Sequence, residues 1–222
     1  MNIPIVVAID GPAGSGKSSV SKAAARALGF AYLDTGGVYR AATWHVLNTA
    51  TDPEDPDAVI ESLESFEHDI SIDPDNFYIR VHEEDITEDI RESRVTNVVS
   101  LVASNPVVRQ YLGDLFRHIM ATTDKPGIIA EGRDITTVVA PDAPVRILLT
   151  ASEEARMARR SAELPQQSQD QTASALRARD AADSRVSDFM TAADGVVTVD
   201  STDFSYEQTI DSVVEVIRSR TS

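Results

Sequence analysis

The sequence predicts an α/β fold in which helices cover both faces of a mainly parallel sheet. Short apolar runs alternate with helical segments over most of the 222 residues, which is the pattern of such three-layer folds. The first run, Ile5–Ile9, is apolar at every position, as expected for a central strand that is covered on both faces. The length suits one substantial domain of this kind.

The elements of the sheet follow one another along the chain. The predicted strands are Ile5–Ile9, Phe30–Leu33, Gly127–Ala130, Val145–Leu149 and Val196–Val199. The predicted helices are Lys17–Leu28, Val38–Leu47, 95–104, 106–121, Ser152–Glu163, Thr172–Asp183 and a closing helix after the capping box of Ser205 and Gln208. Gly29 ends the first helix, and Pro106 suits a helix start. Ligands bind at the carboxyl ends of parallel strands, so the loops after the first, second and third strands are candidate sites.

The stretch 58–95 departs from this alternation. Asp69–Ile72 and Phe77–Val81 flank the turn Asp73–Asn76, which is typical of an antiparallel hairpin. We therefore expect a single domain, residues 1–222, with a core of 1–57 and 96–222. The small hairpin insertion would occupy about 58–95, and a lid segment about 152–171.

Composition excludes several classes of protein. A net charge of −16 repels nucleic acid and anionic membranes, so we expect neither as a partner. The chain has no Cys, no apolar stretch long enough to span a membrane and no signal-peptide pattern around its first strand. We expect a monomer in the cytoplasm.

A phosphate-binding loop follows the first strand. The sequence Gly11-Pro12-Ala13-Gly14-Ser15-Gly16-Lys17-Ser18 fits G-x-x-x-x-G-K-[ST], and it lies between a strand and a helix, as that motif requires. Its glycines let successive backbone N–H groups converge on phosphate oxygens. Lys17 can bridge the β- and γ-phosphates of ATP, and the Ser18 hydroxyl can bind Mg²⁺. We assign ATP binding to the whole segment Gly11–Ser19.

The loop identifies a nucleotide-binding protein and leaves three hypotheses for its activity. These are a nucleoside monophosphate kinase, a kinase of another small acceptor, and a GTPase switch or ATP-driven motor. The chain has no N-K-x-D motif for reading guanine, and its length leaves little room for the additional domain of a motor. Glu131, an acidic residue at the end of a strand, is compatible with a motor as well as with a kinase.

The arginines favour an acceptor that is itself anionic. Of the 20 basic residues, 17 are Arg, whose planar fork of donors binds phosphate in a bidentate way. Arg40, Arg109 and Arg133 lie near the expected acceptor loops. Arg156, Arg159 and Arg160 form a stripe on one helix face, either facing phosphate or facing solvent. Transfer between two phosphates needs many fixed cations, and we assign Arg156 and Arg160 to ATP.

Four segments together resemble bacterial cytidylate kinases. They are Asp10–Ser18, Leu33-Asp34-Thr35-Gly36-Gly37-Val38-Tyr39-Arg40, Glu131-Gly132-Arg133-Asp134 and Arg179-Asp180-Ala181-Ala182-Asp183-Ser184. The resemblance covers nearly the whole chain, including the hairpin insertion. It implies a P-loop fold and transfer of the ATP γ-phosphoryl group to CMP or dCMP.

The resemblance also implies roles for individual residues. Arg40 and Arg133 would hold the acceptor phosphate, and Thr35 and Tyr39 would shape its pocket. Ser100, Arg109 and Asp134 would recognise cytosine, whose exocyclic amine suits a carboxylate acceptor. Arg179 and Asp183 would bind the sugar.

The segment after Asp183 departs from the family pattern. Arg185 follows Asp183 at two residues and not at three, and Ser187-Asp188-Phe189 replaces the usual Ser-Pro-Leu. A phosphate-binding role for Arg185 is therefore left open.

The expected mechanism is alignment and charge stabilisation without a dedicated general base, because the attacking phosphate is already an anion. Lys17, Arg133 and Arg156 are the expected catalytic residues. Mg²⁺ is the expected cofactor, bound directly by Ser18 and through water by Asp34 or Glu131. Closure of the lid at 152–171 would exclude water.

Overall fold

A computed structural model describes residues 3–163, 169–185 and 187–221. The chain divides into two compact units, one formed by residues 1–32 and 120–222 and the other by residues 33–119. Part of the segment expected to act as a lid, residues 164–168, lies outside the described residues. The side chain of Arg179 also lies outside them.

The first unit is built on a five-stranded sheet with the strand order β2-β6-β1-β7-β8. The strands are β1 (Ile5–Asp10), β2 (Ala31–Asp34), β6 (Gly127–Gly132), β7 (Val145–Thr150) and β8 (Val197–Asp200). The pairings of β1 with β6, β1 with β7 and β7 with β8 are all parallel. The central strand β1 has no exposed residue from Val7 to Ile9, which confirms the prediction of a fully covered strand.

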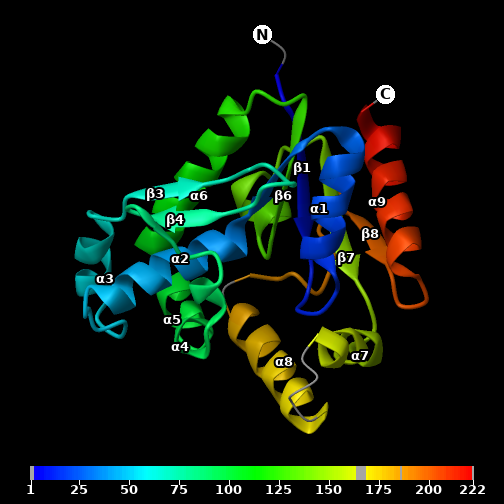
Figure 1. Ribbon diagram of the computed structural model, residues 1–222. Coiled ribbons are helices and arrows are strands. Elements are labelled where there is room, and N and C mark those ends of the chain that lie inside the picture. The colour runs from blue at the N-terminus through cyan, green and yellow to red at the C-terminus, as the bar shows by residue number, and fades with distance from the viewer. Residues whose placement is uncertain (1–2, 164–168, 186, 222) are drawn as a thin grey trace. The chain divides into compact units, whose positions relative to one another are not determined.

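Two helices and a helical turn of this unit pack on the sheet. They are α1 (Lys17–Leu28), α9 (Tyr206–Thr221) and the π-helical turn η2 (Ile135–Val139). The unit also contains α7 (Glu153–Glu163) and α8 (Gln169–Asp183). Figure 1 shows α1 and α9 side by side, in contact with each other and with the strands. The helix α7 packs against α8. Together with the small antiparallel sheet described below, this mainly parallel sheet with flanking helices confirms the predicted fold class.

The ends of α1 and α9 follow the predicted caps. Gly29 terminates α1 in the left-handed conformation, with φ 66°, and its N–H bonds to carbonyls of the last turn. At the start of α9, the Gln208 N–H donates to the Ser205 hydroxyl, and the Ser205 N–H donates to the Gln208 side chain. This reciprocal pair is the predicted capping box.

The second unit surrounds the helix α2 (Thr35–Asn48). Its other helices are α3 (Pro56–Leu63), η1 (Asp89–Arg91), α4 (Ser93–Thr96), α5 (Val99–Ser104) and α6 (Pro106–Thr122). A small antiparallel sheet contains β3 (His68–Ile70), β4 (Ile79–Val81) and β5 (Glu84–Asp85). The hairpin prediction is confirmed for β3 and β4, whereas β5 has no apolar alternation that could have predicted it.

The helices predicted at Val38 and Thr172 begin three residues earlier, at Thr35 and Gln169, and another predicted helix is divided in two. The helix expected over 95–104 is interrupted, because α4 ends at Thr96 and α5 begins at Val99. The sequence Val95-Thr96-Asn97-Val98-Val99 explains the break, since β-branched residues and Asn have low helix propensity.

Candidate functional site

The loop between β1 and α1 is tightly enclosed. Gly14 has φ 76°, and a Cβ built on it would lie 2.9 Å from the Arg156 carbonyl oxygen and 3.3 Å from the Leu176 side chain. A Cβ on Gly11 would overlap the carbonyl oxygen of Leu149. Glycine is therefore required at both positions by the close approach of β7, α7 and α8 to the loop.

A buried carboxylate at the end of β6 holds the two functional side chains of the loop. The Ser18 hydroxyl donates to Glu131 Oε1 at 2.6 Å, and the Lys17 ammonium lies 3.8 Å from Glu131 Oε2. The Tyr32 hydroxyl donates to the same Oε1 at 3.3 Å. Glu131 is only 2% exposed, whereas Lys17 is half-buried and Ser18 is exposed, so a buried carboxylate holds two side chains that solvent and ligands can reach. The parallel pairing of β1 with β6 brings Glu131 to the loop.

A second buried carboxylate fixes the loop that follows β6. Asp10 Oδ1 accepts the Ile135 N–H at 2.9 Å, and its Oδ2 accepts the Thr136 N–H and hydroxyl at 2.8 and 2.6 Å. Burial raises the pKa of the Asp10 carboxyl, while the bonds from Thr136 and Ile135 and the charge of Lys17 oppose that shift. Asp10 thus anchors the segment that carries Arg133 and Asp134.

Arg133 is held on three sides. Its Nε donates to Asp183 Oδ2 at 2.9 Å, its Nη1 donates to the Gly11 carbonyl, and its guanidinium lies 4.6 Å from the centre of the Phe189 ring. Phe189 is almost fully buried, so the face of its ring is a fixed surface on which the Arg133 guanidinium stacks. The structure therefore brings the predicted residues Arg133 and Asp183 together next to the loop.

The arginine stripe on α7 also faces the loop. Arg156 Nη1 donates to the Ala13 carbonyl at 2.9 Å and to Asp180 Oδ2 at 2.5 Å. Arg159 joins the Ser15 carbonyl at 3.2 Å to the hydroxyl and carbonyl of Ser201. Two of the three arginines thus contact protein groups at the loop, which contradicts the alternative of a solvated face for them. Arg160, in contrast, is exposed.

In the second unit, the predicted residues at the start of α2 are organised by Asp34. Its Oδ1 caps the helix by accepting the Gly37 N–H at 2.7 Å, and its Oδ2 lies 3.4 Å from Arg40 Nη2. Thr35 is buried as the first residue of the helix, and the Tyr39 ring meets the Phe116 ring edge-on at 5.8 Å. The expected water-mediated metal role of Asp34 stays a prediction.

The remaining predicted residues lie on other elements. In the second unit, Ser100 is half-buried on α5, and Arg109 Nη1 on α6 donates to the Ala103 carbonyl at 3.3 Å. In the first unit, Asp134 is 6% exposed and directly precedes η2. Arg185 is exposed just after α8.

Sequence reasoning missed several residues of this site, among them Asp10, Asp180 and Phe189. Asp10 and Asp180 lie in segments that resemble the cytidylate kinases, but the sequence gives them no role, and Phe189 differs from the family pattern without indicating one. The apolar run Ile5–Ile9 could have pointed to Asp10, because an acidic side chain at the end of a buried strand needs hydrogen-bond donors to compensate for its burial. Nothing in the sequence indicates that Phe189 lies under an arginine.

Metal and membrane features are sparse in the part of the chain that the structure describes. No cluster of three or more His, Cys, Asp or Glu side chains is arranged to bind a metal ion there. Within the same residues, no helix combines the length and apolar character needed to cross a bilayer.

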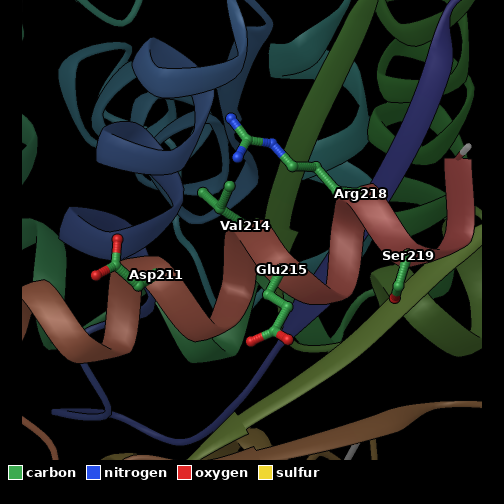
Figure 2. Close-up of a pocket in the computed structure, with 5 residues that line it drawn as sticks. All are labelled: Asp211, Val214, Glu215, Arg218 and Ser219. Atoms are coloured by element: carbon green, nitrogen blue, oxygen red, sulfur yellow. The ribbon is translucent and has the colours of Figure 1, made fainter.

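A surface hollow of about 480 Å³ lies along α9. Figure 2 shows its five lining residues, which are Asp211, Val214, Glu215, Arg218 and Ser219. All of them come from α9 and none from the phosphate loop, so this hollow is separate from the candidate nucleotide site.

Known proteins resemble this chain over nearly its full length. A family profile described as cytidylate kinase matches residues 7–219. The cytidylate kinase of Streptomyces avermitilis is 45% identical over 97% of this chain and 94% of its own length. That of Mycobacterium avium is also 45% identical, over 99% and 98% of the two chains.

A solved structure of a Thermus thermophilus protein shares the fold. It superposes with a TM-score of 0.50 at 15% identity and covers 99% of both chains. At this low identity the likeness supports the fold alone.

Proposed function

Because this chain belongs to the cytidylate kinase family, we propose that its phosphate loop binds ATP and that the γ-phosphoryl group moves from there to the phosphate of CMP or dCMP. As a member of that family, the chain is an ATP-dependent phosphotransferase. The observation that carries the assignment of ATP to this loop is the contact of Lys17 and Ser18 with the buried carboxylate of Glu131. It holds the cation and the hydroxyl at the start of α1, where the loop amides and the helix dipole favour phosphate.

The residues at the loop fit a magnesium ion bound together with ATP. Ser18 Oγ and Glu131 Oε1 are two oxygen ligands 2.6 Å apart, and Mg²⁺ prefers oxygen ligands while keeping several waters and substrate phosphates. We propose that Ser18 binds it directly and Glu131 through water. When bound, the ion would neutralise part of the negative charge of the ATP phosphates.

The chain's own residues align the reactants and stabilise charge. Lys17 bridges the β- and γ-phosphates, and Arg156 and Arg133 stabilise the charge that spreads over the transferred group. The loop N–H groups fix the donor phosphates, which lowers the entropic cost of alignment. No side chain has to remove a proton, because the attacking oxygen of CMP is already ionised.

We assign recognition of the acceptor to residues of each unit. In the first unit these are Arg133, Asp134, Arg179 and Asp183, and in the second Thr35, Tyr39, Arg40, Ser100 and Arg109. Support for Arg40 comes from its buried Nε, which has no hydrogen-bond acceptor among the described residues and is therefore available to an anion. Arg160 is assigned to ATP, and Asp34 to a water-mediated contact with the metal.

Three broader expectations remain proposals. We propose that the chain does not bind nucleic acid, because its net charge of −16 repels the negatively charged phosphate backbone. We further propose that the chain works as a monomer and in the cytoplasm.

An acceptor screen tests the proposal. ADP release would be measured by a coupled assay with ATP and, in separate reactions, CMP, dCMP, UMP, AMP and shikimate. We expect turnover with CMP and dCMP to exceed that with UMP and AMP, and none with shikimate, which offers a hydroxyl and no phosphate. Faster turnover with shikimate, or GTP hydrolysis without any acceptor, would overturn the proposal.

A further inference from the structure

One carboxylate of the chain occupies the phosphate loop. Asp180, on α8, accepts the Ala13 N–H through its Oδ1 at 3.0 Å. Ala13 lies in the middle of the loop, whose backbone N–H groups bind anions. A carboxylate and a phosphate are both anionic acceptors and compete for such a donor.

The same carboxylate also forms an ion pair with Arg156, one of the proposed catalytic residues. Asp180 Oδ2 accepts a bond from Arg156 Nη1 at 2.5 Å, and Arg133 Nη2 lies 3.9 Å from Asp180 Oδ1. The side chains of Arg156 and Asp180 are only 7% and 13% exposed, so water screens their contact weakly. Asp180 therefore contacts both parts of the machinery that the ATP phosphates require.

The position of Asp180 follows from the packing of α8. Leu176, one turn earlier, is 5% exposed, and its Cδ1 would lie 3.3 Å from a Cβ on Gly14 of the loop. Ala173, about one turn before Leu176, is also buried. Leu176 thus packs close to the loop, and this packing of α8 places the short side chain of Asp180 next to Ala13.

Arg156 also has unused capacity for an anion. Its Nε is buried without an acceptor among the described residues. A buried guanidinium donor without a partner is costly, so an arriving phosphate that satisfies it gains binding energy.

We propose that Asp180 is an internal competitor for nucleotide phosphate. In the nucleotide-free protein its carboxylate binds the Ala13 amide and Arg156, and an ATP or ADP phosphate displaces it from both. The contact keeps Arg156 ordered and charge-balanced before ATP arrives. The carboxylate returns when the nucleotide leaves, so it weakens the affinity for the product ADP. This inference rests on the proposed binding of ATP at the loop.

The test is the affinity of Asp180 variants for ADP alone, measured by titration calorimetry without CMP. Asp180→Ala removes the competitor. Asp180→Asn keeps the shape and an acceptor for the Ala13 N–H but removes the charge that holds Arg156. We expect both variants to bind ADP about tenfold more tightly than the unaltered protein, the size expected for removing one charge-assisted contact.

A matched control uses a second ion pair that joins the same two helices. Glu153 on α7 accepts a bond from Arg177 Nε on α8 at 2.6 Å, and both side chains are largely exposed and separate from the loop contacts described above. Glu153→Gln should leave the ADP affinity unchanged. If it tightens binding as much as Asp180→Asn does, general loosening of α8 is the cause and the proposal is wrong.

The sign of the change decides the question. If Asp180 has a purely structural role, its variants should bind ADP more weakly. If it has neither a structural nor a competing role, the affinity for ADP should not change. Either result would overturn the proposal. Circular dichroism would verify folding, and Asp180→Asn serves if the alanine variant does not fold. Since the titration contains no CMP, a failure of the acceptor screen leaves this result interpretable.

Discussion

The phosphate loop in the first unit and the start of α2 in the second both follow a strand, yet they hold their cations differently. Lys17 and Ser18 share a buried carboxylate, and the loop backbone is enclosed by β7, α7 and α8. Arg40 lies 3.4 Å from the carboxylate of Asp34, and the same carboxylate also caps the helix α2. The first site combines the Glu131 carboxylate with an enclosed backbone loop, whereas the second depends on the Asp34 side chain alone. Substitutions should therefore affect the two in different ways.

The largest effect is expected from Lys17→Ala. Removing the cation that bridges the transferred phosphates should lower turnover with CMP by about 10²–10³-fold or more. The fold should be retained, because the backbone of the loop is enclosed independently of this side chain.

Steady-state kinetics and thermal unfolding of the Lys17→Ala variant would be measured together. Near-normal turnover would remove the loop from the mechanism. A collapse of thermal stability would instead mean that the Lys17–Glu131 pair is needed for folding, and the contrast between the two units would fail.

Arg40→Ala should have a smaller and more selective effect. If Arg40 binds the acceptor phosphate, kcat/KM for CMP should fall by about 10–100-fold, as expected for a charge-assisted bond. The KM for ATP should stay unchanged, since the ATP loop belongs to the other unit.

Arg40→Lys sharpens this test. Lys keeps the charge but loses the planar fork, so it should recover only part of the activity. Full recovery would mean that charge alone matters, and an equal loss of ATP affinity would contradict an acceptor role.

Asp134→Ala tests whether the first unit also reads the base. A carboxylate that accepts the cytosine amine favours CMP over UMP, which presents a carbonyl at that position. We expect the ratio of kcat/KM for CMP over UMP to fall by about tenfold, the size of one charge-assisted contact. Competition assays with both nucleotides measure it, and an unchanged ratio would refute base reading at Asp134.

Much of this architecture was predictable from local patterns, and the exceptions share a cause. The strand β1 follows from an apolar run, and the helix α1 from a helical segment that Gly29 ends. The capping box follows from the polar side chains of Ser205 and Gln208. The phosphate loop was predictable because its motif specifies a backbone shape. The pairing of Asp180 with Ala13 joins residues 167 positions apart, and no local pattern specifies such a contact. The Phe189 platform under Arg133 is non-local for the same reason.

The smallest predicted effect contrasts the pH dependence of the two units. In the second unit, His45 is 2% exposed, and its Nε2 donates to the Ser62 carbonyl at 2.9 Å. Burial is the main cause that lowers the pKa of His45 below 6.5, and the nearby His82 adds to it, while the bond to Ser62 opposes the shift. In the first unit, burial shifts the pKa of Asp10 in the opposite direction, upward.

The two shifts give opposite signs of linkage. Because the pKa of His45 is lowered in the folded protein, the unfolded chain binds this proton more readily, so the contribution of His45 is complete above pH 6.5 and is lost as the pH falls toward the lowered pKa. Asp10 has a raised pKa, so its contribution is lost as the pH rises from 3.8 through that pKa. Between pH 6.5 and 5, His45 should reduce the free energy of unfolding by at most about 1.4 kcal/mol per pH unit.

His45→Gln keeps an N–H donor for the Ser62 carbonyl and removes the titration. Urea unfolding across this pH range should therefore show a flatter slope for the variant than for the unaltered protein. His118→Gln, at an exposed position on α6, is the matched control and should keep the original slope. If all three proteins lose stability equally on acidification, the buried histidine is not the source. The acid sensitivity would then come from other titratable groups.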